Sequence, residues 1–365
     1  MREYRMTSPA TAASDSDAID PRLVVVTQEP FNAEAPLAEQ IGLLTPTPLH
    51  YVRTHFGIPR LSAPDWRLAL DGEVARPYHL SYDELRGLPS RSLLVTLECA
   101  GNGRSGLHPP AEGEPWQYGA VSTAEWTGVP LATLLEAASL TSRTREILIE
   151  GADRGMVATR EGPIPFARSM PLEVARHPDT LLAYAMNGEP LTAAHGFPAR
   201  LIVPGWYGMA AVKWVTRIAA LAAPFAGYYQ TERYIMAHPE RGETTSEPLT
   251  TIRVRSLIIA PAAGAVLPRG THRLRGLAWS GEAPVTRLDV SVDGGDTWEP
   301  AELASPAERY AWRRWEYTWR ASASGPATLR SRAFDEAGRT QPTEPEWNHL
   351  GYANNAIQVV PVTVA

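Results

Sequence analysis

The only cysteine of the chain, Cys99, lies at the expected end of a strand, where a thiol could do chemistry. An apolar run over residues 93–97 leads into it, small residues follow at 100–103, and Arg104 comes next. A nearby positive charge lowers the pKa of a thiol, and the thiolate is the form that binds metals or attacks substrates. A lone cysteine is also commonly a small buried apolar residue. Cys99 alone leaves both interpretations open.

A second group of reactive residues lies in the segment 195–214, which is rich in glycine and proline. It carries His195, Arg200 and Lys213, and Lys213 is the only lysine of the chain. The glycines and prolines exclude one regular element and permit close approaches of the backbone. Cationic and donor groups on such a backbone suit a phosphate or another anionic ligand. A single lysine in an arginine-rich chain can equally be there by chance.

Arg53 and His55 lie two residues apart in an extended segment, 21–64, that is punctuated by prolines. Residues two apart in an extended segment share one face, so both side chains could address one site. The alternative is a solvated arginine beside a surface histidine without a shared role.

Several common catalytic signatures are excluded. Residues 101–106 match the glycine pattern of dinucleotide-binding folds, but Pro109 and Pro110 follow and prevent the helix that this motif needs. The chain has no His-Glu-x-x-His motif, no second cysteine, no Gly-x-Ser-x-Gly elbow and no Walker lysine motif. A single thiolate holds a transition metal poorly, but it can complete a metal carried by an organic, anionic cofactor.

The composition is that of an ordinary soluble globular protein. The 365 residues favour two domains, with 44% hydrophobic and 20% charged residues and a net charge of −6. This acidic balance argues against a nucleic-acid-binding protein. No apolar run of about 18 residues occurs, so no membrane span is expected. No signal peptide or twin-arginine motif is seen, and we expect a cytoplasmic location.

The pattern of expected secondary structure changes near Pro248. Residues 1–20 are rich in Ser, Ala, Thr and Asp and predict a flexible tail. Residues 21–247 mix strands with short helices and predict an α+β domain that carries the candidate site. Residues 248–365 predict an all-β, Ig-like sandwich because short alternating runs are separated by turn signals. The expected strands cover residues 252–260, 272–279, 285–293, 310–319, 326–335 and 356–364.

Several separate motifs, taken in order, resemble those of the sulfite oxidase family of molybdopterin enzymes. The resemblance runs from about Tyr51 to Val360. The motifs are Cys99-Ala100-Gly101-Asn102-x-Arg104, Gly119-Ala120-Val121-Ser122-Thr123, Ala183-Tyr184-x-Met186-Asn187-Gly188, His195-Gly196-Phe197-Pro198-x-Arg200, Val212-Lys213-Trp214 and Trp279-Ser280-Gly281.

The resemblance implies a mixed α/β catalytic domain followed by an Ig-like domain through which two copies form a homodimer. It implies that Cys99 ligates a molybdenum held by one pyranopterin dithiolene. Cys99, Arg53, Arg104 and Tyr234 would form the catalytic centre. The residues implied to bind the cofactor are Tyr51, Val52, Arg53, His55, Cys99, Asp153, His195, Arg200, Ala211, Val212 and Lys213. No haem is expected, so an electron acceptor such as a cytochrome would be a separate protein.

The resemblance implies oxygen-atom transfer on a small anionic or sulfur-containing substrate, with the oxidation of sulfite to sulfate as the leading activity. Three positions depart from the animal and plant sulfite oxidases. Leu350 stands where they carry a sulfite-binding arginine, Gly103 replaces another arginine, and Glu112, four residues before Trp116, replaces the vertebrate lysine. Losing fixed cations weakens the recognition of a doubly charged anion. A relative acting on another substrate, such as an S-oxide reductase, and a non-catalytic binding protein of the same fold are the alternatives.

Overall fold

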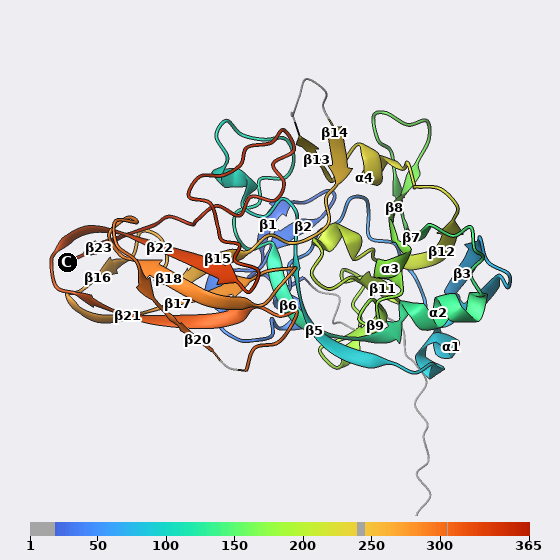
Figure 1. Ribbon diagram of the computed structural model, residues 1–365, viewed down its shortest axis with the longest axis horizontal. Coiled ribbons are helices and arrows are strands. Elements are labelled where there is room, and N and C mark those ends of the chain that lie inside the picture. The colour runs from blue at the N-terminus through green and yellow to red at the C-terminus, as the bar shows by residue number, and fades with distance from the viewer. Residues whose placement is uncertain (1–18, 239–244, 305) are drawn as a thin grey trace, which may run out of the picture.

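A computed structural model describes residues 19–238, 245–304 and 306–365, which fold into two adjoining parts rich in strands (Figure 1). The α-helices within these ranges are short, and the longest has 8 residues. The expected mixture of strands and helices over 21–247 is therefore mostly strand. The predicted tail over residues 1–20 lies outside the described residues, apart from Ile19 and Asp20.

The first part contains two five-stranded sheets. One has the order β10-β9-β6-β5 with β11 paired to β9, and the other has the order β4-β3-β12-β7-β8. Strand β12 runs parallel to β3 and antiparallel to β7. The strands of this part, including the ribbons β1-β2 and β13-β14, are β1 (Val24–Thr27), β2 (Asn32–Glu34), β3 (Arg67–Gly72), β4 (Tyr78–Ser81), β5 (Arg91–Glu98), β6 (Val121–Pro130), β7 (Glu146–Gly155), β8 (Ile164–Pro171), β9 (Leu181–Met186), β10 (Glu189–Pro190), β11 (Arg200–Ile202), β12 (Val215–Leu221), β13 (Ile235–His238) and β14 (Thr245–Pro248).

Short helices connect these strands. Helix α1 (Tyr82–Gly87) begins with a capping box, in which the Ser81 hydroxyl accepts from the Glu84 amide and the Glu84 carboxylate accepts from the Ser81 amide. Helix α2 (Leu131–Ala138) follows β6 directly and buries one apolar face against the core. The remaining helices and 3-10 turns are α3 (Leu172–Ala175), α4 (Tyr228–Thr231), η2 (Leu37–Glu39), η3 (Thr47–Leu49), η4 (Arg104–Gly106) and η5 (Gly208–Ala210).

The second part is a β-sandwich of two sheets, with the orders β15-β17-β21-β20 and β16-β23-β22-β18-β19. Side chains from both sheets share one apolar cluster, so the sheets pack face to face. Each expected strand overlaps an observed one because the alternation of apolar and polar residues marks the buried face. The strands are β15 (Arg255–Ala260), β16 (Val266–Leu267), β17 (Gly270–Trp279), β18 (Val285–Ser291), β19 (Glu299–Pro300), β20 (Glu302–Leu303), β21 (Arg313–Ala321), β22 (Gly325–Asp335) and β23 (Val360–Val364).

The two parts are joined at strand β5. The Thr96 amide donates to the Tyr310 carbonyl at 2.9 Å, and the Trp312 amide donates to the Thr96 hydroxyl at 2.8 Å. One apolar cluster includes Leu201 from the first part and Leu257 from the second. The sandwich is therefore packed against the strand that leads to Cys99.

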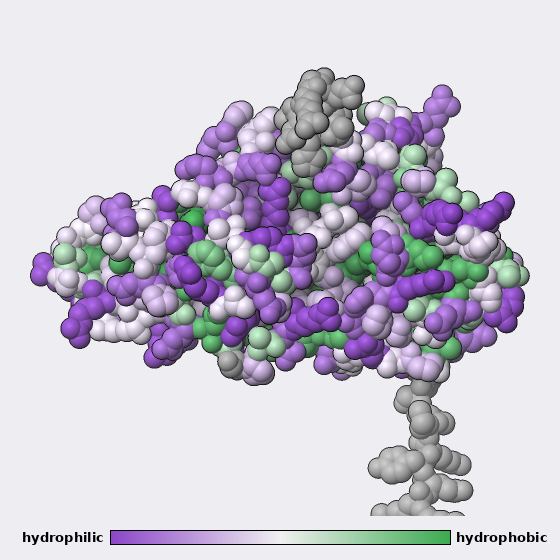
Figure 2. All heavy atoms as spheres, in the orientation of Figure 1, coloured by the Kyte–Doolittle hydropathy of each residue, from purple (hydrophilic) through white to green (hydrophobic). Residues whose placement is uncertain are grey.

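Hydrophilic side chains cover most of the face seen in Figure 2, and apolar ones lie between them in scattered patches. Among the described residues, no helix combines the length and the apolar character needed to cross a membrane.

Candidate active site

Cys99 lies directly after strand β5, at the start of a tight turn. Its amide donates to the Ala120 carbonyl at 2.8 Å, and its carbonyl accepts from the Asn102 amide at 2.9 Å. Gly103 adopts a φ of 84°, a left-handed conformation that favours glycine, so the chain can reverse within a few residues. The thiol is free and buried.

Burial raises the pKa of the Cys99 thiol, although Arg53 and Arg104 oppose this shift. The expected lowering of the thiol pKa by Arg104 is therefore outweighed by desolvation in the protein alone. A buried thiol without a metal favours its neutral form because the thiolate loses its hydration. A cation bound at the sulfur would reverse that balance.

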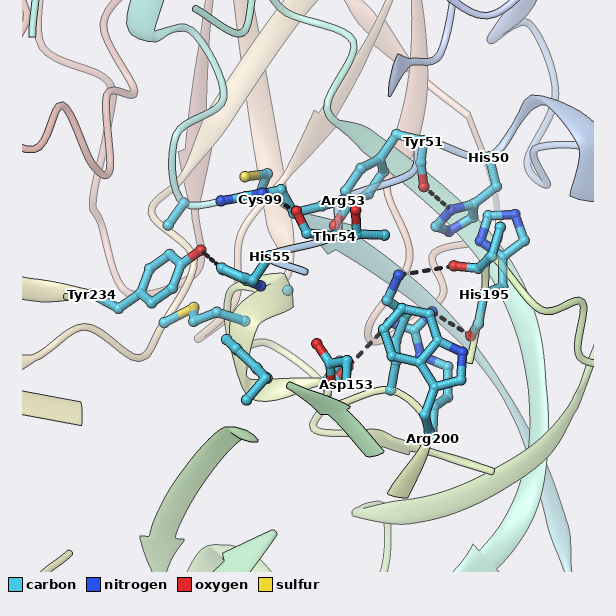
Figure 3. A pocket seen from close by; sticks show the side chains of 18 residues that line it. His50, Tyr51, Arg53, Thr54, His55, Cys99, Asp153, His195, Arg200 and Tyr234 are labelled. Carbon is cyan, nitrogen blue, oxygen red and sulfur yellow. Dashed lines mark hydrogen bonds between the residues drawn. The ribbon is translucent and has the colours of Figure 1, made fainter. Parts of the chain in front are cut away.

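The Cys99 side chain opens into a pocket of ≈ 620 Å³, called here the first pocket. It is lined by the N-terminal extended segment, the Cys99 turn, strand β7 and the segment before β12 (Figure 3). The predicted site residues that line it are Tyr51, Arg53, His55, Cys99, Asp153, His195, Arg200, Ala211, Lys213 and Tyr234. Val52 and Val212 do not line it; their backbones pair with Ala33 and Leu201, respectively.

One end of the first pocket is cationic. Arg200 donates to the carbonyls of His195 and Ala211 at 3.0 and 3.2 Å, and Lys213 donates to the Ala194 carbonyl at 2.8 Å. Burial lowers the pKa of Arg200 to about 10, and burial together with Arg200 lowers the pKa of Lys213 well below its usual value. Neither side chain forms an ion pair with any residue that the structure describes. Buried cationic side chains without an ion-pair partner favour an anionic ligand at this end.

Asp153, on β7, is the carboxylate of the first pocket. Burial raises the pKa of Asp153 to about 6, while the positive charge of Lys213 opposes the rise. The Asp153 Oδ1 atom is buried and has no partner among the residues described. An acceptor or proton-bearing oxygen is therefore available to a ligand in the pocket.

His50 is a lining residue that the sequence motifs missed. Its Nδ1 lies 3.1 Å from the Tyr51 carbonyl, and its ring lies 5.1 Å from the ring of His195. Burial lowers the pKa of His50 to about 3, and the charges of Arg200 and Lys213 add to this effect. No signal in the sequence marks His50, because alternation along an extended segment places it on the face opposite to Tyr51, Arg53 and His55. Other lining residues outside the predicted set are Thr54, Ala100, Phe166, Ala194, Gly208, Met209 and Trp214.

A second pocket of ≈ 750 Å³ meets the first around Cys99. Arg53, His55, Cys99 and Tyr234 line both pockets. Residues lining the second pocket alone include Arg104, Glu112, Glu114, Trp116, Arg233 and Tyr352. Of the predicted catalytic residues, Arg53, Cys99 and Tyr234 therefore lie at the junction, and Arg104 lines the second pocket beside it.

Tyr234 and His55 form a buried polar contact at this junction. The Tyr234 Oη atom lies 2.5 Å from His55 Nε2, and Tyr234 adopts a φ of 54°. Its ring stacks on that of Tyr352, with the centroids 5.0 Å apart. Burial raises the pKa of Tyr234 well above its usual value. Burial and the charge of Arg53 lower the pKa of His55 well below its usual value. A neutral phenol therefore faces a neutral imidazole, and the strained backbone is held by the surrounding packing.

Arg104 is enclosed by glycines from three segments. A Cβ atom at Gly101 would lie 2.6 Å from the guanidinium carbon, one at Gly113 would lie 2.9 Å from Nη1, and one at Gly351 would lie 2.7 Å from Cγ. The guanidinium also donates to the carbonyls of Leu350 and Glu114 at 3.0 and 2.7 Å. These glycines let the backbone approach closely, so the Arg104 side chain is held in one place.

Two carboxylates compensate the arginines of the second pocket. Glu114 lies 3.3 Å from Arg53 Nη2, and Glu112 lies 2.7 Å from Arg233 Nη2. The hydrogen bond from Arg233 lowers the pKa of Glu112 below its usual range. With His55 neutral, three arginines and two glutamates give the lining a formal charge of +1.

Comparisons with known proteins agree with this geometry. Residues 55–229 match the oxidoreductase molybdopterin binding domain, and residues 246–365 match the Mo-co oxidoreductase dimerisation domain. Mitochondrial sulfite oxidase of Mus musculus is 36% identical, with 97% of this chain and 69% of that protein covered. The chain belongs to the sulfite oxidase family. It is therefore a molybdopterin-dependent oxidoreductase, as the motifs predict, and the alternative of a non-catalytic binding protein is set aside.

The chain is also similar to proteins that are named for other activities. An NADH nitrate reductase of Glycine max is 34% identical, with 90% of this chain and 40% of that protein covered. The crystal structure of the sulfane dehydrogenase SoxCD from Paracoccus pantotrophus matches with a TM-score of 0.81 and 30% identity, covering 95% of this chain and 86% of that one. The expected sulfite-oxidase-type fold is confirmed by this match.

The first pocket fits the molybdopterin cofactor of the sulfite oxidase family. Its lining holds buried polar atoms without partners among the described residues: His50 Nε2, Arg53 Nε, Asp153 Oδ1 and Arg200 Nε. Buried polar groups are normally satisfied, so these atoms mark positions for the polar atoms of a ligand. The cationic end suits an anionic group of that ligand, and Cys99 supplies a soft sulfur donor for a metal.

Proposed function

We propose that this oxidoreductase oxidises a small sulfur compound by oxygen-atom transfer, with sulfite as the leading substrate. One observation supports the proposal above all. The thiol of Cys99 lies where the pocket suited to the cofactor meets a second pocket lined by arginines. A substrate in the second pocket would thereby reach the metal side of a cofactor held in the first.

Each group of residues has a defined task in this proposal. Cys99 is the protein ligand of the molybdenum, and His195, Arg200 and Lys213 bind the anionic end of the cofactor. Tyr51, His55, Asp153 and Ala211 complete the cofactor site, whereas Val52 and Val212 hold its neighbouring segments in place through their backbone bonds to Ala33 and Leu201. When bound, the cofactor supplies two-electron redox chemistry that protein side chains lack.

Arg53 and Arg104 orient an anionic substrate, and Tyr234 holds a hydrogen bond at the reacting end of the pocket. Guanidinium groups donate to oxyanions in a fixed, planar arrangement. The paired contact of Tyr234 with His55 fixes the phenol, so its position does not depend on the substrate.

A second candidate substrate is a sulfane sulfur compound of lower charge. Leu350 supplies no cation, and Glu112 offsets Arg233, so the lining carries only a formal charge of +1. The likeness to the sulfane dehydrogenase supports the same substrate class. An S-oxide reductase activity stays a prediction that the same assays test.

Assembly and electron transfer complete the proposal. A homodimer through residues 248–365 is supported by the match to the dimerisation domain, with residues 21–247 as the catalytic domain. A separate electron acceptor, such as a cytochrome, and a cytoplasmic location are further predictions, as is a cofactor set of one molybdopterin per chain without haem. Light scattering on the purified protein tests the dimer, and reduction of added cytochrome c tests the acceptor.

The deciding experiment is a substrate screen on protein made in a host that supplies molybdopterin. We expect about one molybdenum per chain and turnover of sulfite or of a sulfane compound with a dye acceptor. Protein without stoichiometric molybdenum would contradict the whole proposal. Turnover confined to sulfoxides with reduced dye would contradict the oxidative direction.

A further inference from the structure

The residue before the proposed molybdenum ligand takes part in a buried network with the second part of the chain. Glu98 accepts from Arg255 Nη1 at 2.7 Å and from Asn102 Nδ2 at 2.9 Å through one oxygen. Its other oxygen accepts from Trp279 Nε1 at 2.8 Å. Arg255 lies on β15 and Trp279 on β17, so both donors come from the sandwich.

The backbone of the Cys99 turn is held from the same side. Arg255 Nη1 also donates to the Asn102 carbonyl at 3.0 Å. The Asn354 side chain donates to the Gly103 carbonyl at 2.8 Å, and the Ala353 amide donates to the Ala100 carbonyl at 2.8 Å. Three carbonyls of the turn therefore accept hydrogen bonds from the second part of the chain.

Arg255 occupies space that the turn leaves for it. A Cβ atom at Gly103 would lie 2.5 Å from Arg255 Nη2, so a side chain at this position would displace the guanidinium. The side chains of Glu98 and Arg255 are each 2% exposed. A buried ion pair contributes little net stability over an apolar pair, but removing one partner leaves an uncompensated charge. Such a pair specifies one arrangement of the segments that it joins.

We propose that Glu98 and Arg255 are positioning residues, through which the sandwich fixes the turn that presents the Cys99 sulfur. The carboxylate of Glu98 bonds to Asn102, so the pair fixes the turn on both sides of Cys99. The inference builds on the proposed function only in taking Cys99 as the metal ligand. A change in the sandwich is thereby transmitted to the active site.

The single cysteine allows a test that does not depend on the cofactor. The rate at which a thiol reagent modifies Cys99 is measured in the folded, cofactor-free chain of the wild type and of Arg255→Met. Breaking the pair should release the turn and raise the rate at least tenfold, and Arg255→Lys should restore most of the protection. Because the chain has one cysteine, the signal reports on this turn alone.

The matched control is Arg332→Met. It breaks a partly buried ion pair within the sandwich, in which Arg332 Nη2 lies 3.3 Å from Asp289 Oδ2. It should lower the melting temperature but leave the Cys99 reaction rate unchanged. Equal rates in Arg255→Met and wild type, at a clearly lowered melting temperature, would overturn the proposal and leave the pair a purely structural role. Should Arg255→Met fail to fold, the isosteric Glu98→Gln carries the same test.

Loaded protein gives a second readout. In Arg255→Met the Mo(V) paramagnetic resonance signal should change and kcat should fall at least tenfold, with KM changed less than threefold. If no variant or wild type binds molybdenum while the thiol test succeeds, the positioning role stands and the proposed function fails. If the resonance signal and kcat match the wild type, the positioning role fails and the proposed function stands.

Discussion

Replacing Glu112 by glutamine tests whether compensation of charge in the second pocket governs the choice of substrate. The Glu112 carboxylate lies 2.7 Å from Arg233 Nη2 and 3.1 Å from His349 Nε2. Glutamine keeps the size of the side chain and removes its negative charge. The formal charge of the lining then rises from +1 to +2, and Arg233 becomes available to a substrate oxygen.

The size of the effect follows from Coulomb's law with solvent screening. The side chains of Glu112 and Arg233 are 48% and 32% exposed, so water weakens their field. At a separation of about 8 Å between the charge at position 112 and the substrate, and with a dielectric constant close to that of water, one unit charge changes the binding energy by ~0.5 kcal/mol per substrate charge. A dianion therefore gains ~1 kcal/mol, which is roughly a fivefold lower KM, and a singly charged substrate gains about half that energy.

The assay measures the KM for sulfite and, as a non-reacting dianion, the inhibition constant of sulfate. Both should fall about fivefold in Glu112→Gln at low ionic strength, and the effect should shrink as salt is added. The control is Glu346→Gln, because Glu346 pairs with Arg253 at the same 2.7 Å and does not line the pocket. An equal shift in both variants, or unchanged sulfate inhibition in Glu112→Gln, would refute the reasoning.

Three further predictions follow from the same contacts. Cys99→Ser should abolish turnover while circular dichroism shows an unchanged fold, and full activity in this variant would exclude the ligand assignment. Gly113→Ala should raise the KM at least threefold by displacing Arg104, whereas Gly338→Ala, also at a positive φ but with no atom within 4 Å of the added carbon, should change only stability. The pKa of His50 is about 3 in the folded protein and 6.5 in the unfolded chain. Between these pH values the unfolded state binds more protons, so the free energy of unfolding falls as the pH drops through this window. Between about pH 6.5 and pH 5, the free energy of unfolding should therefore fall by ~2 kcal/mol less in His50→Phe than in the wild type. Urea denaturation of the cofactor-free protein at both pH values measures this difference.

Much of the site could be predicted because its residues lie in short local motifs. Cys99 and Arg104 lie in one turn, and Arg200 and Lys213 lie in one irregular segment, so the sequence order already groups them. The strands of the sandwich were predictable for a related reason, since alternation of apolar and polar residues records which face is buried. In each case the information is local in the chain.

The contacts between the two parts could not be predicted, because they join distant residues. Arg255 lies 157 positions from Glu98, and nothing around either residue signals a partner. An arginine in a strand pattern is normally a solvated side chain, and only packing of the sandwich on β5 reveals that this one is buried. The direction of the Cys99 pKa shift could not be predicted for the same reason. Burial depends on tertiary packing, and its effect on the thiol pKa outweighs the opposing charge of Arg104.

Leu350 shows how one position can lose a charge and keep a structural task. Its side chain offers no cation to the second pocket, yet its carbonyl accepts a hydrogen bond from Arg104 at 3.0 Å. The backbone here supports Arg104 whatever side chain stands at 350, and Gly351 next to it makes the close approach possible. Removing the cation therefore lowers the attraction for an anion without loosening Arg104. Under the proposed function, discrimination between sulfite and a less charged sulfur compound would rest on Arg53 and Arg104, and Arg53 is already partly neutralised by Glu114.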